Sequence, residues 1–133
     1  DYNRMCLLLA VLERRLHLRF SANDVYLNIA GGMRLIEPAA DLAVAVALIS
    51  AISDAVIPPD LIVFGELGLA GEVRSVSHAD YRVKEAYRLG FRRIVLPKRS
   101  VASLKGKTDA ELIGVSHLFE VLSLLKKEKR EEG

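Results

Sequence analysis

Hydrophobic and polar residues follow two different periods along this chain, which predicts a domain built from both helices and strands. Spacings of three and four residues, or an apolar character nearly all round, predict helices over residues 3–15, 39–53, 79–89 and 117–129. Alternation or a short apolar run predicts strands over residues 25–29, 33–36, 61–64, 92–96 and 111–115. Because these elements are intermixed, the expected fold class is α+β, or mixed α/β, with a mixed sheet.

Glycine and proline mark the boundaries of these elements. Three glycines predict a bent hairpin between residues 65 and 76. Gly90 is expected to end the helix over residues 79–89, and Pro97 is expected to stop the next strand and begin a loop. The side chains expected to face inward from that helix are Val83, Ala86, Tyr87 and Leu89.

Length and composition indicate one globular domain in a reducing compartment. The chain has 133 residues, of which 51% are hydrophobic and 27% charged, and this is enough for one core. Its single cysteine, Cys6, cannot form an internal disulfide, which favours a cytoplasmic location. No apolar run reaches the roughly 20 residues of a membrane span, and no secretory signal is found. The chain begins within a helical pattern and without methionine, so it is expected to be part of a longer protein.

The distribution of charge is more informative than its sum. The net charge is only +2, which gives a weak general argument for nucleic-acid binding. The basic side chains between residues 74 and 99 are Arg74, Arg82, Lys84, Arg88, Arg92, Arg93, Lys98 and Arg99. Only Asp80 and Glu85 oppose them there. They form either an ordinary solvated face or a stripe of phosphate contacts that binds DNA regardless of sequence. Few aromatic residues accompany them, so base stacking is not expected.

Four segments carry a resemblance to a known family. Residues 25–32 read VYLNIAGG, residues 37–43 read EPAADLA, residues 64–74 read FGELGLAGEVR, and residues 82–91 contain RVKEA and LGF. Together they resemble the proteolytic domain of Lon proteases, and more closely the Lon-like carboxy-terminal domain of the RadA (Sms) family of bacterial DNA repair proteins. The resemblance covers almost the whole chain. It implies the Lon proteolytic-domain fold, which is ribosomal protein S5 domain 2-like, over residues 1–125, followed by a charged tail over residues 126–133.

The same resemblance implies that the catalytic pair of the family is missing. In Lon-type peptidases the nucleophilic serine follows a proline at the start of the buried helix; Pro38 matches that proline, and Ala39 stands in the serine position. The general-base lysine lies ten residues before the glycine that ends the next helix. Gly90 matches that glycine, so Asp80 stands in the lysine position. A methyl group cannot attack a carbonyl, so no catalytic residue is expected and the chain is interpreted as a pseudo-protease.

Other sources of chemistry are weak. Ser77 and His78 precede Asp80 and suggest a triad, but adjacent residues rarely converge on one site. These polar residues are expected to lead into a helix, with an N-cap role for one of them. No zinc motif is present, and residues 65–71 lack the lysine–serine pair of a phosphate-binding loop, so no metal site is expected.

Arg34 and Arg74 are flanked by apolar and glycine residues, and each is expected to pair with an acidic side chain. The candidate partners are Glu37, Asp41, Glu66 and Glu72. Such pairs are expected within the former active-site region or across a subunit boundary.

The resemblance implies a role in binding and assembly. The chain is expected to be a scaffold that forms a homo-oligomeric ring, with a hexamer expected, and that contacts single-stranded or branched DNA. It would support branch migration of recombination intermediates together with RecA-type recombination machinery. A zinc finger and a RecA-like ATPase, with their zinc and ATP/Mg, are expected in an amino-terminal part outside this chain, and no cofactor is expected within it. Two alternatives stay open: a residual serine hydrolase or peptidase, and a module that recruits a protein without DNA contacts.

Overall fold

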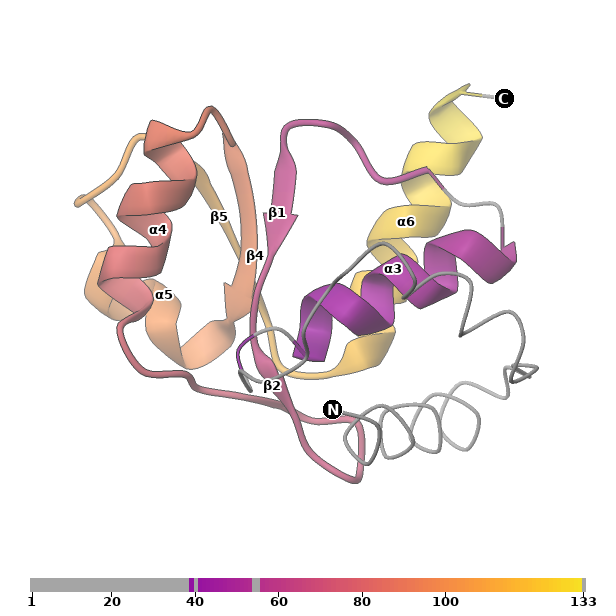
Figure 1. Ribbon diagram of the computed structural model, residues 1–133, viewed down its shortest axis with the longest axis horizontal. Helices are drawn as coiled ribbons and strands as arrows, with labels where there is room; N and C mark the ends of the chain where they lie inside the picture. The colour runs from indigo at the N-terminus through magenta and orange to yellow at the C-terminus, as the bar shows by residue number, and fades with distance from the viewer. Residues whose placement is uncertain (1–38, 40, 54–55, 133) are drawn as a thin grey trace.

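The computed structural model describes residues 39, 41–53 and 56–132, and Figure 1 shows how their helices and strands are arranged. The elements follow in the order α3 (Asp41–Ser53), β1 (Leu61–Val63), β2 (Glu66–Leu67), β3 (Val73–Arg74), α4 (Ala79–Arg88), β4 (Arg93–Pro97), α5 (Lys98–Leu104), β5 (Glu111–Val115) and α6 (Leu118–Glu132). The predictions that lie outside the described residues are the helix over residues 3–15, the strands over residues 25–29 and 33–36, and the roles of Cys6, Arg34, Glu37 and Pro38.

Strands β1, β4 and β5 form a three-stranded parallel sheet with β4 in the centre. Its register pairs Ile62 with Ile94 and Val95 with Ile113. The strands are parallel because helices cross over between them: α4 precedes β4, and α5 joins β4 to β5. β2 and β3 form a separate antiparallel pair, as the glycine pattern predicts. The expected mixed sheet is therefore wholly parallel in its described part, and antiparallel pairing is confined to this ribbon.

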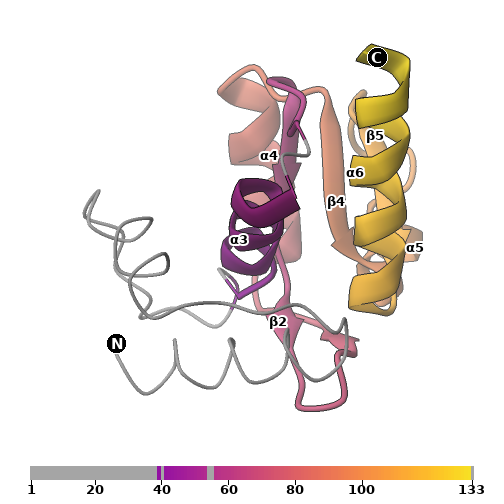
Figure 2. The same cartoon turned by 90° about the vertical axis from the view of Figure 1, so that its right-hand side faces the viewer.

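The sheet is covered on both faces, which explains why its strands are short, continuous apolar runs. α3 and α6 lie side by side on one face, and α4 and α5 cover the other (Figure 1, Figure 2). Alternation along the strands divides the core between the two faces. Val63, Val95 and Val115 pack under α3 and α6, whereas Ile94 and Leu96 pack under α4 and α5.

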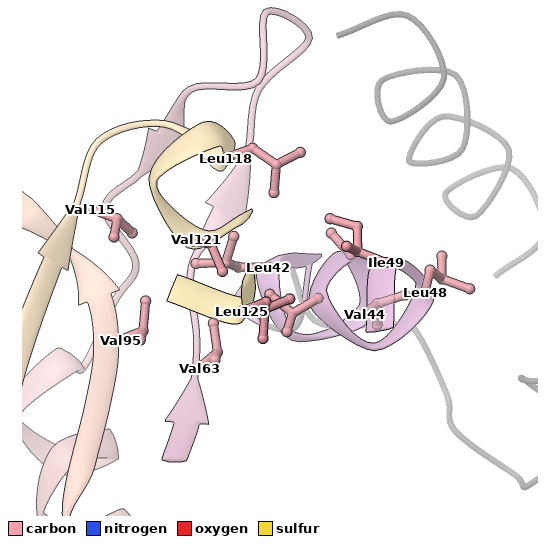
Figure 3. Packing of buried hydrophobic residues seen from close by; sticks show 12 residues of the cluster. Leu42, Val44, Leu48, Ile49, Val63, Val95, Val115, Leu118, Val121 and Leu125 are labelled. Carbon is pink, nitrogen blue, oxygen red and sulfur yellow. The ribbon is translucent and has the colours of Figure 1, made fainter. Parts of the chain in front are cut away.

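Helix α3 is buried around most of its circumference, as its nearly all-apolar sequence predicts. Leu42 and Ile49 are fully buried, whereas Ala47 is exposed. Figure 3 shows Leu42 beside Val121 and Leu125, two buried side chains of α6. Full burial of such a side chain contributes roughly 1.5–3 kcal/mol, so this packing is the main force that fixes α3 on the sheet.

Helix α4 ends in the glycine-based cap that the sequence predicts. Gly90 has a φ of 106°, and its N–H donates to the carbonyl of Tyr87 at 3.0 Å. The N–H of Phe91 donates to the carbonyl of Ala86 at 3.0 Å, which completes a Schellman motif. The prediction that Leu89 faces inward is wrong, since this residue is 63% exposed. The turn at Gly90 brings Phe91 onto the core in its place.

The segment after Pro97 forms helix α5, where the sequence predicts a loop. Val101 and Leu104 are the only apolar side chains of this seven-residue helix that pack against the sheet, too few to produce a helical period in the sequence. Pro97 itself still belongs to β4. α5 approaches β5 closely at Gly114, where an added Cβ would lie 2.8 Å from Cγ2 of Val101.

The β2–β3 ribbon is anchored to the start of α6. The N–H of Val73 donates to the carbonyl of Ser116 at 2.9 Å, and the N–H of Leu118 donates to the carbonyl of Gly71 at 3.0 Å. The turn between the two strands projects beyond the end of the sheet (Figure 1, Figure 2).

Helix α6 begins close to its predicted start and continues to Glu132, through residues that the charge pattern predicts as a tail. Leu118, Val121 and Leu125 are buried on one face, as predicted. Among the helices in the described part of the chain, none has both the length and the apolar character of a membrane span.

Candidate functional site

Ala39, the residue expected at the serine position of the family, is buried at the start of α3. It is 4% exposed. Its carbonyl accepts a hydrogen bond from the N–H of Gly65 at 2.9 Å, and the N–H of Leu42 donates to the carbonyl of Gly65 at 3.0 Å. These two bonds join the start of α3 to the chain just after β1. The side chain at this junction is a methyl group, which offers no nucleophile.

Asp80, the residue expected at the lysine position, lies exposed in the first turn of α4. Helices α3 and α4 begin at the same end of the sheet but on opposite faces (Figure 1). Asp80 lines a groove of about 510 Å³ that also contains Lys84, Lys107 and Asp109. The methyl group of Ala39 and the carboxylate of Asp80 cannot perform the chemistry of a serine and a lysine.

The segment that enters α4 uses backbone groups rather than side chains. His78 occupies the N-cap position, as predicted for one of these residues, but its side chain makes no capping hydrogen bond. His78 is left-handed, with φ 59° and ψ 38°, a conformation that costs of order 1–3 kcal/mol for a residue other than glycine. The side chain of Arg82 reaches back to this segment, where its Nε donates to the carbonyl of Ser77 at 3.0 Å. The backbone N–H of Arg82 donates to the carbonyl of His78, also at 3.0 Å.

Asp41 is a buried carboxylate in the first turn of α3, where the free N–H groups of the helix favour negative charge. Its Oδ2 accepts a hydrogen bond from the N–H of Leu67 in β2 at 3.1 Å. Asp41 is one of the acidic partners predicted for Arg34 or Arg74. Arg74 pairs instead with Glu72, and Arg34 lies outside the described residues.

The pair between Arg74 and Glu72 lies exposed on the β2–β3 ribbon. Nη2 and Nε of Arg74 lie 3.1 Å and 3.3 Å from Oε2 of Glu72, and Oε1 accepts a hydrogen bond from the N–H of Ala70 at 3.0 Å. The pKa of Glu72 is lowered by its own backbone N–H, then by the Arg74 guanidinium and the Ala70 N–H. The predicted pairing of Arg74 with an acidic residue is therefore confirmed.

Two further arginines hold carboxylates in two-point ion pairs. Arg88 donates from Nε and Nη2 to Glu85, both at 2.9 Å, and this hydrogen bonding lowers the pKa of Glu85. Arg93 donates to the two oxygens of Asp60 at 2.9 Å and 3.1 Å, which lowers the pKa of Asp60. Arg93 also lines a small cavity with Leu125, so it lies on the α6 face of the sheet.

Half of the eight predicted DNA-binding residues gather on α4 and on the turn after it. We refer to these four as the α4 cationic surface: Arg82, Lys84, Arg88 and Arg92. The other four are distributed over the ribbon, the α6 face and the first turn of α5: Arg74, Arg93, Lys98 and Arg99. The structure therefore places four of the predicted residues on or next to α4, where Arg82 and Lys84 line different grooves, and the other four at three separate positions. The positions of Lys98 and Arg99 in a helix correct the predicted loop.

Aromatic side chains accompany the α4 cationic surface, which the sequence does not lead one to expect. Tyr81 is 64% exposed on α4. The guanidinium of Arg92 lies over the ring of Tyr87, 4.1 Å from its centroid. The phase of α4 contains the signal for Tyr81, because this residue lies on the side opposite Val83 and Ala86.

Within residues 39, 41–53 and 56–132, no three His, Cys, Asp or Glu side chains come together in a way that could hold a metal ion.

Comparisons with known proteins place the chain among named families. The model of the family described as subunit ChlI of Mg-chelatase matches residues 9–100. The DNA repair protein RadA of Aquifex aeolicus is 44% identical over 125 residues, which cover 94% of this chain and 28% of that protein. RadA of Brucella abortus is 53% identical over 100 residues, which cover 75% of this chain and 21% of that protein. RadA of Escherichia coli is 41% identical over 124 residues, which cover 93% of this chain and 27% of that protein. This chain spans about a quarter of the length of the curated relatives it matches.

Proposed function

This chain belongs to the family described as subunit ChlI of Mg-chelatase, and from that premise and its RadA relatives we propose that it is a Lon-like domain of a DNA repair protein. The repair role is preferred to the chelatase role in the family's description, because proteins named RadA are 41–53% identical to this chain over most of its length. The domain binds DNA without sequence preference and catalyses no reaction of its own.

The observation that carries this proposal is the α4 cationic surface. Each phosphate that a cation neutralises releases counterions from the DNA. Four such contacts predict that the logarithm of the binding constant falls linearly with the logarithm of the salt concentration, with a slope of about −3 to −4. The exposed pair between Arg88 and Glu85 does not remove Arg88 from this set, because exposed ion pairs are weak enough to be exchanged for a phosphate. The resulting affinity depends on salt and not on base sequence.

Ala39 and Asp80 support the non-catalytic part of the proposal. Neither side chain supplies the nucleophile or the amine base of the Lon mechanism. The fold does not need that chemistry, because buried apolar side chains hold α3 against the sheet.

Ring assembly is the second part of the proposal. The domain forms a homo-oligomeric ring, with a hexamer expected, that scaffolds a RecA-like ATPase and supports branch migration with RecA-type recombination machinery. Two large exposed apolar side chains, Leu69 on the ribbon and Phe119 at the start of α6, are candidate contacts between copies. The mass of the particle, measured with and without a DNA oligonucleotide, tests the ring: a mass equal to one chain at high concentration contradicts it.

Charge reversal tests the DNA-binding surface. Lys84→Glu and Arg88→Glu are suitable variants, because both side chains are exposed, whereas Arg82 anchors the segment before α4. Each is expected to weaken binding to all sequences alike and to reduce the salt slope by about one, measured by fluorescence anisotropy. Lys105→Glu makes the same charge change on the loop after α5 and is expected to leave affinity unchanged. Equal affinity of all three variants and the wild type would favour a module that recruits a protein.

A further inference from the structure

Tyr81 shares the outer stripe of α4 with two cations of the α4 cationic surface. Residues three and seven positions apart lie on one side of a helix, so Tyr81, Lys84 and Arg88 form a single row. All three are exposed, and the buried residues Val83 and Ala86 occupy the opposite side. α4 therefore presents an aromatic ring and two cations to solvent in one line.

Tyr81 stands between two grooves. The first, about 490 Å³, lies between α4 and the chain at the end of β1, with Phe64 and Arg82 among its lining residues. The second, about 510 Å³, lies between α4 and the loop after α5, and contains Lys84 and Lys107. Asp80 and Asp109 balance the two lysines in the second groove. Glu85 also lines the first groove, but it is paired with Arg88, so a phosphate is expected on this first side, next to Arg82.

Arg92 supplies a second planar group, over the ring of Tyr87, a residue that lines the second groove. Its guanidinium lies 4.1 Å above the ring of Tyr87, and Nη1 donates to the carbonyls of Tyr87 and Phe91 at 3.0 Å and 3.4 Å. These contacts hold the guanidinium plane in one orientation on the exposed surface. Guanidinium planes stack on nucleic-acid bases, as aromatic rings do.

A single exposed tyrosine is ordinary on a protein surface, and it is the surrounding cations that distinguish Tyr81. Lys84 lies one helical turn from Tyr81 and Arg88 lies two turns away, on the same side of α4. Aromatic rings next to cations are the usual elements of surfaces that bind single-stranded nucleic acid.

We propose that Tyr81 stacks on an unpaired base and is the residue by which the α4 cationic surface distinguishes single-stranded from duplex DNA. This inference rests on the proposed DNA-binding function and assigns to one residue the single-strand contact that the family resemblance implies. The bases of a duplex are stacked on one another and present only their edges, whereas an unpaired base offers its face to an aromatic ring. No preference for a particular base is expected, because every base has such a face.

The test compares the affinities of the wild type and two Tyr81 variants for a labelled oligo-dT strand and for a duplex of the same length. Tyr81→Ala is expected to weaken binding of the single strand by about 5- to 150-fold, and Tyr81→Phe, which keeps the ring, by less than about 3-fold. Val56→Ala is the control, because Val56 is an exposed apolar side chain that lines neither groove. Affinity for the duplex is expected to be equal in all four proteins.

Tyrosine fluorescence gives an independent readout, since the chain contains no tryptophan. The single strand is expected to quench the emission of the wild type more than that of Tyr81→Phe. If Lys84→Glu weakens DNA binding while Tyr81→Ala does not, the stacking inference is overturned and the DNA-binding function stands. An equal loss for single strand and duplex in Tyr81→Ala also overturns it. A wild-type protein that binds neither form at low salt overturns both.

Discussion

The carboxylate of Asp41 accepts a hydrogen bond from the backbone N–H of Leu67, a residue 26 positions further along the chain. This contact joins the first turn of α3 to strand β2 and helps to set the position of the ribbon that carries Arg74. The ribbon lies outside the parallel sheet, so its placement depends on such contacts with the helices.

Loss of the Asp41 carboxylate is expected to destabilise the domain. Asp41→Ala leaves the partly buried N–H of Leu67 without this acceptor, which costs about 1–3 kcal/mol of unfolding free energy. Asp41→Asn keeps an acceptor oxygen and loses the charge at the helix start, so a smaller cost of about 0.3–1 kcal/mol is expected. Urea unfolding measures both, with the exposed Asp109→Ala as control. Wild-type stability in Asp41→Ala would contradict the role of this contact.

Gly114 is expected to tolerate no side chain, because α5 passes too close. An added Cβ would lie 2.8 Å from Cγ2 of Val101 and 3.1 Å from Cα of Lys98. Gly114→Ala is therefore expected to cost about 1–3 kcal/mol of unfolding free energy. Val101→Ala removes the nearer of the two obstacles, so the double variant should lose less than the sum of the single losses. Strict additivity in the thermal or urea unfolding of the three variants would argue against this steric account.

Acid is expected to weaken the fold through the carboxylates that arginines hold ionised. The pKa values of Asp60 and Glu85 are lowered by hydrogen bonds from Arg93 and Arg88. A lowered acidic pKa stabilises the folded state above the ordinary value, and this stability is lost as pH falls through the folded value. The free energy of unfolding should therefore be level near neutral pH and decline below the ordinary values of 3.8 for Asp and 4.5 for Glu.

Urea unfolding across a pH series measures this decline, and Arg93→Met isolates the part due to Asp60. The variant should be less stable than the wild type at neutral pH and should lose less of its stability in acid, because the pKa of Asp60 returns towards its ordinary value. Parallel pH profiles of variant and wild type would show that this ion pair carries no such effect.

A serine-reactive phosphonate probe is expected to label no residue of this chain, and casein should remain uncut. Position 39 carries a methyl group, and Asp80 is not an amine base. Ala39→Ser is expected to stay unlabelled as well, because the site is buried and no lysine stands at position 80. Intact mass spectrometry measures labelling, with an active serine hydrolase as the positive control. A labelled serine in the wild type would support the residual hydrolase alternative.

Elements with local signals could be predicted from the sequence. The apolar spacing of α4 and the glycine that ends it lie within one segment, and the Schellman motif forms where Gly90 predicts it. Helix α5 has no such signal, because its packing depends on the close approach of β5 at Gly114. Leu89 continues the apolar period of α4, yet the left-handed turn at Gly90 rotates the chain and packs the half-buried Phe91 against the core instead.

In the candidate site too, contacts within one segment could be predicted from the sequence, whereas contacts between distant segments could not. The pair of Arg88 with Glu85 lies within one helical turn and can be read from spacing. Arg93 meets Asp60 across 33 residues, and this contact depends on the parallel register of β1 and β4, which the sequence does not specify. The exposure of Tyr81 follows from helical phase and was available from the sequence, although the count of aromatic residues pointed away from it.

Backbone hydrogen bonds at Val73 and Leu118 connect the ribbon directly to the start of the last helix. A force on the ribbon would therefore be transmitted to the start of α6 through main-chain hydrogen bonds. Both bonds are formed by main-chain atoms, so substitution of the exposed side chains of the ribbon does not remove them. The ribbon can therefore acquire a different binding partner while its connection to α6 is preserved.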